Sequence, residues 1–464
     1  MDPQTTRRIV DRFWDEKAIP TLESYIAIPN LSPYFDPEWK ANGHMDRATK
    51  LLAGWAGNQG IRGARLEVVE SEGKTPLIFI EVEGTRPGTV LLYGHLDKQP
   101  EMSGWDEGLG PWKPVWRGER LYGRGAADDG YAIFAALAAI RALQDQKTDH
   151  PRLVVMIEGS EESGSFDLPW YVDHLKERIG TPELVVCLDS GCGDYERLWV
   201  TTSLRGVVTG SLRVEVLTEG VHSGDAGGIV PSSFRVLRHL LDRLEDAEMG
   251  RLRPEWLYVE VPPNVLESVR RSASILGDEV WSKFPLAPGV RPVSDDPVEL
   301  LLGKTWRPSV SYVGIDGMPG GRQAGNVLRP FTDVKLSIRI PPTLPAAEAD
   351  RKIRELLTSD PPHGARVTWS SDGGAPGWLA PEIDARLDKA LDEASKAWFG
   401  AGFATIGEGG SIPFMGMLHE KFPEAQFVVT GVLGPHSNAH GPNEFLDLPT
   451  AKKVSACVAA VIAS

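Results

Sequence analysis

Three short apolar runs in the first half of the chain form the clearest pattern of hydrophobic positions. They cover residues 88–94 (GTVLLYG), 152–159 (RLVVMIEG) and 183–189 (ELVVCLD), and turn residues bound each one. Continuous apolar runs of this length are typical of strands buried on both faces of a parallel sheet. Residues 128–146 are rich in Ala and Leu and begin with two carboxylates, which predicts a helix. The order of strand, helix and strand indicates an α/β fold with a mostly parallel sheet.

The pattern changes after residue 205, where apolar and polar positions begin to alternate. Half-exposed antiparallel strands alternate in this way. We therefore expect residues 206–379 to form an α+β domain, inserted into a first domain made of residues 1–205 and 380–464. The elements expected in and after the insert are strands at 207–220 and 333–342 and helices at 232–250, 347–357 and 381–400.

Composition and charge exclude several classes of protein. The chain has 464 residues, too many for one core, which favours two domains. Its formal net charge is −15, and nucleic-acid binding requires clustered positive charge, so no such partner is expected. No apolar run approaches the roughly 18 residues of a membrane span, and the charged N-terminal stretch has no signal-peptide core. The three scattered cysteines fit a reducing compartment, so we expect a cytoplasmic protein.

Side chains that can bind metal follow each of the three apolar runs. The carboxyl ends of parallel strands meet at one edge of an open sheet, so we expect these side chains to converge. Many carboxylates would repel one another without a cation, and a mixed imidazole and carboxylate set suits zinc, cobalt or manganese. On an extended segment His95 and Asp97 point the same way, so Asp97 can orient a ligating His95. The converging residues are His95, Asp97, Asp128, Glu158, Glu161, Glu162 and Asp189.

Six motifs in a fixed order carry a resemblance to a known family. They are YGHLD (93–97), LYGRGAADD (121–129), EGSEESGS (158–165), VHSGDAGG (221–228), EGGSIP (408–413) and SNAHGPNE (437–444). The chain resembles the zinc-dependent exopeptidase and amidohydrolase family of carnosinase, cytosolic non-specific dipeptidase, aminoacylase and succinyl-diaminopimelate desuccinylase. YGHLDKQP and GEGGSIP are most similar to the dipeptidase branch.

The resemblance implies a zinc-peptidase catalytic domain that holds two divalent metal ions. Zinc is the expected metal, with manganese and cobalt as alternatives. Glu161 matches the general base of the family. The peptide bond after the bridging aspartate is cis in the family, so we expect a cis bond between Asp128 and Asp129. The implied ligands are His95, Asp128 and Asp189 for one ion and Asp128, Glu162 and His440 for the other.

The resemblance also implies a function for the insert. It is similar to the lid and dimerisation domain of the family, so a homodimer is expected. In dimeric members the residue that matches His222 reaches the site of the other subunit and stabilises the oxyanion. Arg339 matches an arginine that binds the substrate carboxylate, and Gly410 and Ser411 would wrap the same end of the substrate. Asn326 is a further substrate-binding candidate.

Three functions remain open from the sequence. The first is a dipeptidase that acts on dipeptides or small peptides. Because Lys98, Gly130 and Ser190 depart from the dipeptidase pattern, an N-acyl-amino-acid amidohydrolase is the second. A non-catalytic metal-binding protein is the third, and the presence of Glu161 and of every implied ligand argues against it. Glu158, which precedes the glutamate pair, is expected to be structural.

Overall fold

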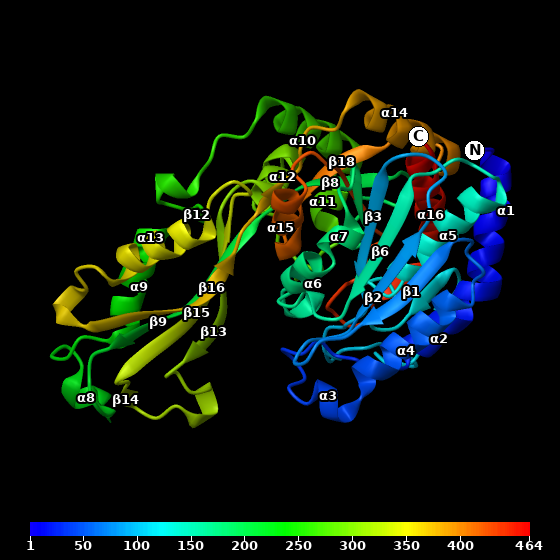
Figure 1. The fold of residues 1–464 in the computed structure, drawn as a ribbon. Coiled ribbons are helices and arrows are strands. Elements are labelled where there is room, and N and C mark those ends of the chain that lie inside the picture. Colours follow the sequence, from blue (N-terminus) through cyan, green and yellow to red (C-terminus); the bar gives the residue numbers. More distant parts are fainter.

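The protein consists of a large sheet flanked by helices and a smaller antiparallel sheet that projects from it as a lid (Figure 1). The computed structural model describes residues 1–464 apart from the Pro413 side chain. The chain enters the lid at Arg205-Gly206 and returns between residues 375 and 378. Both termini lie beside each other on the large body.

The large sheet has the strand order β1-β2-β6-β3-β7-β19-β8-β17, and β18 pairs with β8. β3 is parallel to β6 and β7, and β19 is parallel to β7, so the carboxyl ends of these strands share one edge. This confirms the α/β fold with a mainly parallel central sheet, which β1 and β2 extend with antiparallel pairing. The strands are β1 (Ala64–Val69), β2 (Leu77–Val82), β3 (Thr89–His95), β6 (Arg152–Glu158), β7 (Leu184–Cys187), β8 (Trp199–Leu204), β17 (Trp378–Leu379), β18 (Ala404–Glu408) and β19 (Gln426–Val429).

Helices cover both faces of the large sheet. α5 packs against α16 and α1 over one face, and α6 and α15 cover the other. α5 begins at Ala132 rather than at residue 128, because Asp128 to Tyr131 form the turn that leads into it. No helix of the described residues is both long and apolar enough to cross a membrane. The helices are α1 (Pro3–Phe13), α2 (Ile19–Ile26), α3 (Trp39–Asn42), α4 (His44–Gly57), α5 (Ala132–Asp145), α6 (Leu168–His174), α7 (Lys176–Ile179), α14 (Ala385–Trp398), α15 (Pro413–Lys421) and α16 (Leu448–Ala463).

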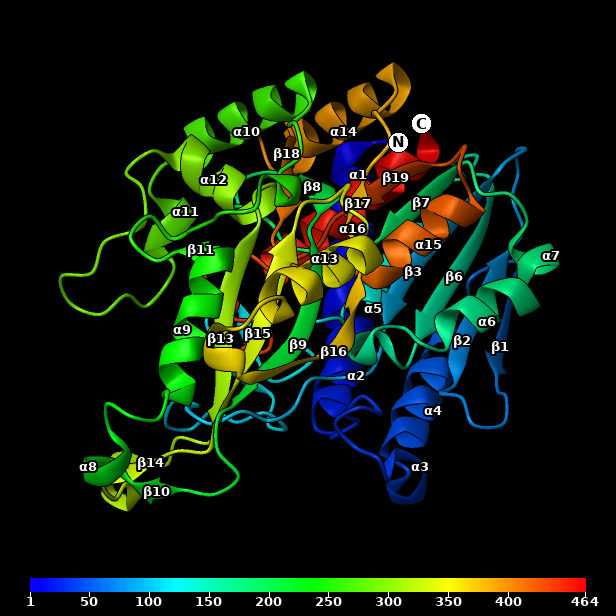
Figure 2. The same ribbon diagram turned by 90° about the vertical axis from the view of Figure 1, so that its left-hand side faces the viewer.

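The lid is an antiparallel sheet of order β13-β15-β9-β16 with two helices on one face. Every second residue of β9 and β15 is buried, and these residues pack against α9 and α13. The other face is turned toward the large body (Figures 1 and 2). α9 ends at Leu244 and not at residue 250, because Glu245 is extended and begins a short hairpin. The elements are β9 (Gly206–Glu215), α9 (Ser233–Leu244), β11 (Glu245–Asp246), β12 (Arg251–Leu252), β13 (Ser309–Asp316), β15 (Phe331–Ile340), α13 (Ala346–Thr358) and β16 (Arg366–Ala375), with β10 (Val221–His222), α8 (Ser223–Ala226) and β14 (Val327–Leu328) at the distal tip.

Three helices inside the predicted insert lie next to the large sheet. α10 (Pro263–Leu276) and α12 (Pro297–Thr305) contact β18, and α11 (Glu279–Ser282) packs between them. Their apolar side chains form a small core of their own. The range 206–379 therefore supplies both the lid and a wall beside β18.

A small third sheet joins two segments that are distant in the sequence. β5 (Arg120–Tyr122) pairs with β4 (Val115–Arg117) on one side and with β20 (Phe445–Asp447) on the other. The turn after β5 is thereby held against the loop before β20.

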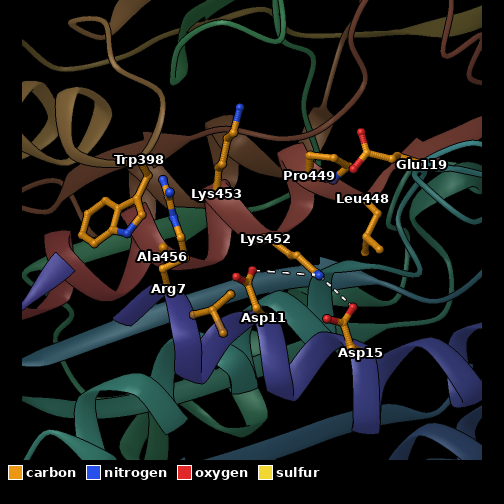
Figure 3. A pocket seen from close by; sticks show the side chains of 11 residues that line it. Arg7, Asp11, Asp15, Glu119, Trp398, Leu448, Pro449, Lys452, Lys453 and Ala456 are labelled. Carbon is orange, nitrogen blue, oxygen red and sulfur yellow. Dashed lines mark hydrogen bonds and ion pairs between the residues drawn. The ribbon is translucent and has the colours of Figure 1, made fainter. Parts of the chain in front are cut away.

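A hollow of about 330 Å³ lies between α1 and α16 (Figure 3). Lys452 Nζ is 2.7 Å from Asp15 Oδ1 and 3.9 Å from Asp11 Oδ1. Lys452 is thus paired with two aspartates, and the described residues that line this hollow include none of the predicted site residues.

Candidate metal centre

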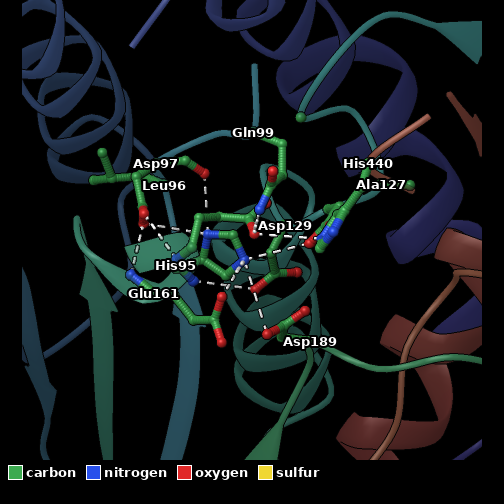
Figure 4. Close-up of polar contacts among 12 residues, drawn as sticks. His95, Leu96, Asp97, Gln99, Ala127, Asp129, Glu161, Asp189 and His440 are labelled. Atoms are coloured by element: carbon green, nitrogen blue, oxygen red, sulfur yellow. Dashed lines mark hydrogen bonds and ion pairs between the residues drawn. The ribbon is translucent and has the colours of Figure 1, made fainter. Parts of the chain in front are cut away.

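The side chains predicted at the strand ends converge at the carboxyl edge of the large sheet (Figure 4). His95 is the last residue of β3, Glu161 and Glu162 form a short turn after β6, and Asp189 follows β7. Asp128 comes from the turn before α5, and the peptide bond that follows it is cis, as the resemblance implied.

His95 lies at the centre of this cluster. Its Nε2 atom is 3.4 Å from Asp128 Oδ1, 3.8 Å from Asp189 Oδ2 and 3.9 Å from Glu161 Oε2. Two groups of three residues each bring one ligand atom per residue within 4.8 Å of one another: His95, Glu161 and Asp189, and His95, Asp128 and Glu162. The cluster therefore offers enough nitrogen and oxygen donors for more than one cation.

His440 joins the cluster from the loop between β19 and β20. Its Nε2 atom is 3.1 Å from Asp128 Oδ2 and 3.3 Å from Glu162 Oε2. Asp128 thus directs one oxygen toward His95 and the other toward His440. This is the arrangement that a bridging carboxylate requires.

Asp97 supports both the imidazole and the glutamate turn. His95 Nδ1 is 3.1 Å from the Asp97 carbonyl oxygen and 3.4 Å from Oδ1 of the Asp97 carboxylate. The same carboxylate also accepts the backbone N–H groups of Glu161 at 3.1 Å and Glu162 at 3.0 Å. Asp97 is fully buried, where hydrogen bonds are stronger than in water. It therefore fixes two ligand-bearing segments at once.

Burial of so many acids changes their titration. Burial raises the pKa of Glu161 well above its usual value, and the charge of Asp189 raises it further. Burial likewise raises the pKa of Asp189 to about 6. The pKa of His95 is lowered by burial, but Asp128, Asp189 and Asp97 outweigh this effect and raise it overall. The raised pKa values reflect burial and the mutual repulsion of these acids, which a bound cation would relieve.

Two buried atoms of the cluster lack the contact that a metal would supply. Among the described residues, His95 Nε2 and Glu162 Oε1 are buried without a hydrogen-bond partner. Such atoms are rare in folded proteins. One imidazole among several carboxylates is also a typical donor set for zinc and similar divalent ions. The residues present therefore fit a divalent-metal centre.

The cluster opens into a cavity of about 520 Å³ between the large body and the lid. Arg339 enters this cavity from the face of β15 opposite to the helices, and Gly410 and Ser411 enter it after β18. Arg339 Nη1 donates to Ser411 Oγ at 3.2 Å, and Ser411 Oγ donates to the Arg205 carbonyl at 2.6 Å. The predicted carboxylate-binding residues therefore share a cavity with the predicted metal ligands.

The wall of this cavity beside β18 was not predicted. It comes from α10 to α12 and includes the apolar side chains of Leu276, Val280 and Leu301. Lys304 on α12 lies 2.8 Å from Glu408 Oε2. The sequence pattern indicated helices of this kind only for other parts of the insert.

His222 and Asn326 lie apart from the cluster. His222 pairs with Val327 across the short ladder of β10 and β14, and the Asn326 carbonyl accepts the Ser223 N–H at 2.9 Å. Both residues are exposed at the distal tip of the lid, near α8 (Figure 2). They are absent from the described residues that line the cavity. Within one chain, these two predicted residues are remote from the metal ligands.

Gln99 and Asp129 also support the cluster, although the sequence predicted no role for them. Gln99 Nε2 donates to Glu162 Oε2 at 2.7 Å. Asp129 Oδ2 accepts the backbone N–H of His95 at 3.1 Å. Their position in the sequence could have indicated this role, because Gln99 is a polar residue shortly after Asp97 and Asp129 directly follows Asp128.

Glu158 is turned into the structure, as predicted. Its carboxylate accepts hydrogen bonds from Tyr93, from Ser165 at 2.8 Å and from Ser160 at 3.1 Å. It belongs to neither of the two metal-binding groups found among the described residues. Its hydrogen bonds hold the start of the glutamate turn.

Two departures from the dipeptidase pattern have structural causes. Lys98 is fully buried, and its ammonium donates to the carbonyls of Tyr25 and Ile28 at 2.8 Å each. A Cβ atom on Gly130 would lie 2.3 Å from the Gly125 carbonyl oxygen, so a side chain does not fit there. Neither residue is among those found to line the cavity, whereas Ser190 is.

Comparison with known proteins gives a consistent result. Residues 91–464 match the sequence model of Peptidase family M20/M25/M40. The chain is 30% identical over 429 residues to the cysteinylglycine-S-conjugate dipeptidase of Corynebacterium striatum, which covers 90% of each chain. It is 27% identical over 426 residues to the beta-Ala-His dipeptidase of Homo sapiens, with 89% of this chain and 82% of the relative covered. The solved structure of the di-peptidase Dug1p from Saccharomyces cerevisiae has the same fold, with a TM-score of 0.78, 19% identity and coverage of 100% and 98% of the two chains.

Proposed function

Because the chain belongs to Peptidase family M20/M25/M40 and is a metal-dependent hydrolase of peptide bonds, we propose that it cleaves dipeptides and small peptides with Glu161 as general base. One observation carries this proposal. The predicted ligands converge in one cluster, which is buried except for His440, and that cluster opens into the cavity that holds Arg339.

The cluster is proposed to hold two divalent ions, most readily zinc, with manganese or cobalt as alternatives. The contacts of Asp128 with both histidines support a bridging role for this residue. When bound, a pair of such ions lowers the pKa of a water molecule and polarises the scissile carbonyl. The proposed ligands are His95, Asp128 and Asp189 for one ion and Asp128, Glu162 and His440 for the other.

Glu161 is proposed to take the proton of the attacking water and to pass it to the leaving amine. Its carboxylate lies beside the proposed ligands, with Oε2 3.9 Å from His95 Nε2, where it can reach a water molecule bound by the ions. Asp97 holds the Glu161 backbone N–H and so limits the positions that this side chain can take. This restraint suits a carboxylate that takes a proton from water in one step and gives it to the leaving amine in the next.

Arg339, Ser411 and Gly410 are proposed to bind the carboxylate end of the substrate. Among the described residues, the Arg339 guanidinium donates one hydrogen bond, to Ser411, so its other N–H groups are available to a ligand. A guanidinium binds a carboxylate through two parallel hydrogen bonds.

The site is proposed to be completed in a homodimer that forms through the lid. His222 and Asn326 lie at the lid tip, far from the ligands of their own chain, and a second subunit could bring them to a substrate. His222 would then stabilise the oxyanion. The three cysteines are free and buried, which is consistent with the proposed cytoplasmic location.

A second candidate, an N-acyl-amino-acid amidohydrolase, has one observation in its favour. Two acids, Glu279 and Glu408, line the wall of the cavity beside β18, and Glu408 is already paired with Lys304 at 2.8 Å. The apolar side chains of Leu276, Val280 and Leu301 beside it suit an acyl chain. Both candidates use the same metal centre and the same base.

A substrate panel separates the two candidates. Enzyme loaded with zinc or manganese is incubated with dipeptides and with N-acyl amino acids of the same C-terminal residue, and products are measured by mass spectrometry. Glu161→Gln serves as the blank. Faster turnover of substrates with a free amino end supports the dipeptidase. Turnover of acylated substrates alone supports the amidohydrolase, and no turnover of either set contradicts both.

A further inference from the structure

A buried ion pair between Arg124 and Glu444 lies next to the metal ligands and has no role in the proposed chemistry. We propose that this pair is a positioning unit, which fixes Asp128 and His440 relative to each other and thereby sets the occupancy of the metal position that they share. The inference rests on the proposed two-metal site.

The small third sheet brings the two charges together. Phe445 of β20 faces Tyr122 of β5, and the Gly123 N–H continues this ladder by donating to the Glu444 carbonyl at 3.0 Å. Arg124 Nη1 is then 2.7 Å from Glu444 Oε2, and the two side chains are 1% and 0% exposed. Strand pairing thus fixes the ion pair between segments that are about 320 positions apart in the chain.

Glu444 binds the loop that presents Asp128. Its Oε1 atom lies within hydrogen-bonding distance of three backbone N–H groups, those of Gly125 at 3.0 Å, Ala127 at 3.2 Å and Asp128 at 3.3 Å. Successive N–H groups around one anion form a compact nest. The conformation of this loop, and with it the place of the Asp128 carboxylate, therefore depends on the Glu444 side chain.

Arg124 binds two further ligand-bearing segments. Its Nη2 donates to the Gly441 carbonyl at 2.8 Å, directly after His440, and its Nε donates to the Pro100 carbonyl at 3.1 Å, in the segment that follows Asp97. One guanidinium thus joins the His440 loop to the segment after β3, while its partner Glu444 holds the Asp128 loop.

The contacts predict a selective effect. Glu444 and Arg124 contact the loops of Asp128 and His440, but they make no hydrogen bond to Asp189 or to the glutamate turn among the described residues. The ion proposed to be held by Asp128, Glu162 and His440 takes two of its three ligands from these loops, whereas the ion proposed to be held by His95, Asp128 and Asp189 takes only the shared Asp128 from them. A buried ion pair is often no more stabilising than an apolar replacement. We therefore attribute this pair to the positioning of the ligand-bearing loops rather than to the stability of the fold.

The test is a metal titration of Glu444→Gln, with two sites resolved by isothermal calorimetry and by the absorption spectrum of bound cobalt. Partners that orient ligands typically change metal affinity by about 10–100-fold. We expect the Kd of the site that contains His440 to rise by about this factor and the Kd of the other site to rise by less than about 3-fold. At saturating metal, kcat should return to within a few-fold of wild type, since the base and the ligands remain.

Glu81→Gln is the matched control. Glu81 is also a carboxylate held by arginines, at 2.7 Å from Arg152 and 2.6 Å from Arg178, but it lies toward the opposite end of the large sheet. This substitution should leave the metal affinity of both sites unchanged. If Glu444→Gln does not fold, the neutral pair in Arg124→Gln/Glu444→Gln replaces it, with the same expected loss at one site.

The possible outcomes separate the inference from the proposed function. Equal weakening of both sites, or no change at either, would overturn the positioning role while leaving the two-metal proposal intact. A loss of kcat that excess metal does not restore would also overturn it. A wild-type protein that binds one equivalent would refute the two-metal site and the inference together.

Discussion

The carboxyl edge of the large sheet and the distal tip of the lid both carry predicted site residues, but their surroundings are opposite. His95 and Asp97 are almost fully buried and are held by hydrogen bonds from neighbouring segments. His222 and Asn326 are exposed, and they belong to short elements at the end of a long sheet (Figure 2). One region is enclosed by its own chain, and the other is exposed at the end of the lid.

The difference shows which part of a site a single fold can determine. Parallel strands bring their carboxyl ends together whatever the sequence between them, so ligands at strand ends must meet. A tip that touches little of its own chain has no such constraint. Its function depends on what approaches it, and the predictions below test each side of this contrast.

The largest effect is expected at the buried edge, from Glu161→Gln. Removing a general base lowers turnover by about 10²–10⁴-fold, and we expect at least a hundredfold loss of kcat. The amide keeps the shape of the side chain, so metal content measured by atomic emission should be unchanged. Full activity, or loss of metal together with activity, would contradict the assignment of Glu161 as base rather than ligand.

At the lid tip, His222→Ala should lower kcat by about a hundredfold, the cost of losing one donor to an oxyanion. Co-expression with Glu161→Gln provides the sharper measurement. A mixed dimer contains one site with both Glu161 and the other subunit's His222, so about a quarter of wild-type activity should return if pairing is random. Two inactive variants that stay inactive when mixed would show that His222 does not act across subunits.

Arg339→Met tests the cavity between the two regions. A hydrogen bond to a charged group is worth about 1.5–3 kcal/mol, so KM should rise about tenfold to a hundredfold with a smaller change in kcat. The rise should be confined to substrates with a free C-terminal carboxylate and should be absent for their amides. Equal changes for acids and amides would contradict a carboxylate contact.

The smallest effect concerns stability at the buried edge. Burial raises the pKa of Glu158 from 4.5 to about 7. The folded protein therefore keeps a proton that the unfolded chain releases, so the free energy of unfolding falls as the pH rises from 4.5 to 7, by at most about 3 kcal/mol. Glu158→Gln stays neutral and should flatten this dependence.

Urea unfolding of the metal-free protein at pH 5 and pH 8 measures the Glu158 effect. The exposed substitution Glu382→Gln is the control and should keep the wild-type dependence. An unchanged slope in Glu158→Gln would show that Glu158 is already ionised when buried.

The sequence predicted the centre of the fold and the ligand cluster because both follow from local patterns. Apolar runs marked β3, β6 and β7, and the residues after them named His95, Glu161 and Asp189. Boundaries were less certain. The sequence predicted a helix from Asp128, but residues 128–131 form a turn, and α5 begins at Ala132.

The parts that were missed depend on contacts between distant segments. Arg124 lies in the motif of residues 121–129 and Glu444 in the motif of residues 437–444, but only the pairing of β5 with β20 brings them together. Lys98, a departure from the dipeptidase pattern, is bound to the carbonyls of Tyr25 and Ile28 around the end of α2. The helices beside β18 carry no pattern that distinguishes a cavity wall from an ordinary surface.

The cavity has one consequence for how such enzymes diverge. Arg339 stands on the lid, whereas the metal ligands stand on the large sheet, and the chain crosses directly between these two sheets at Arg205-Gly206 and at residues 375–378. A substitution at either crossing that tilts the lid would change the length of molecule that fits, while every atom of the metal centre stays in place. Selection for new substrates can therefore act on a joint that contains none of the reactive groups.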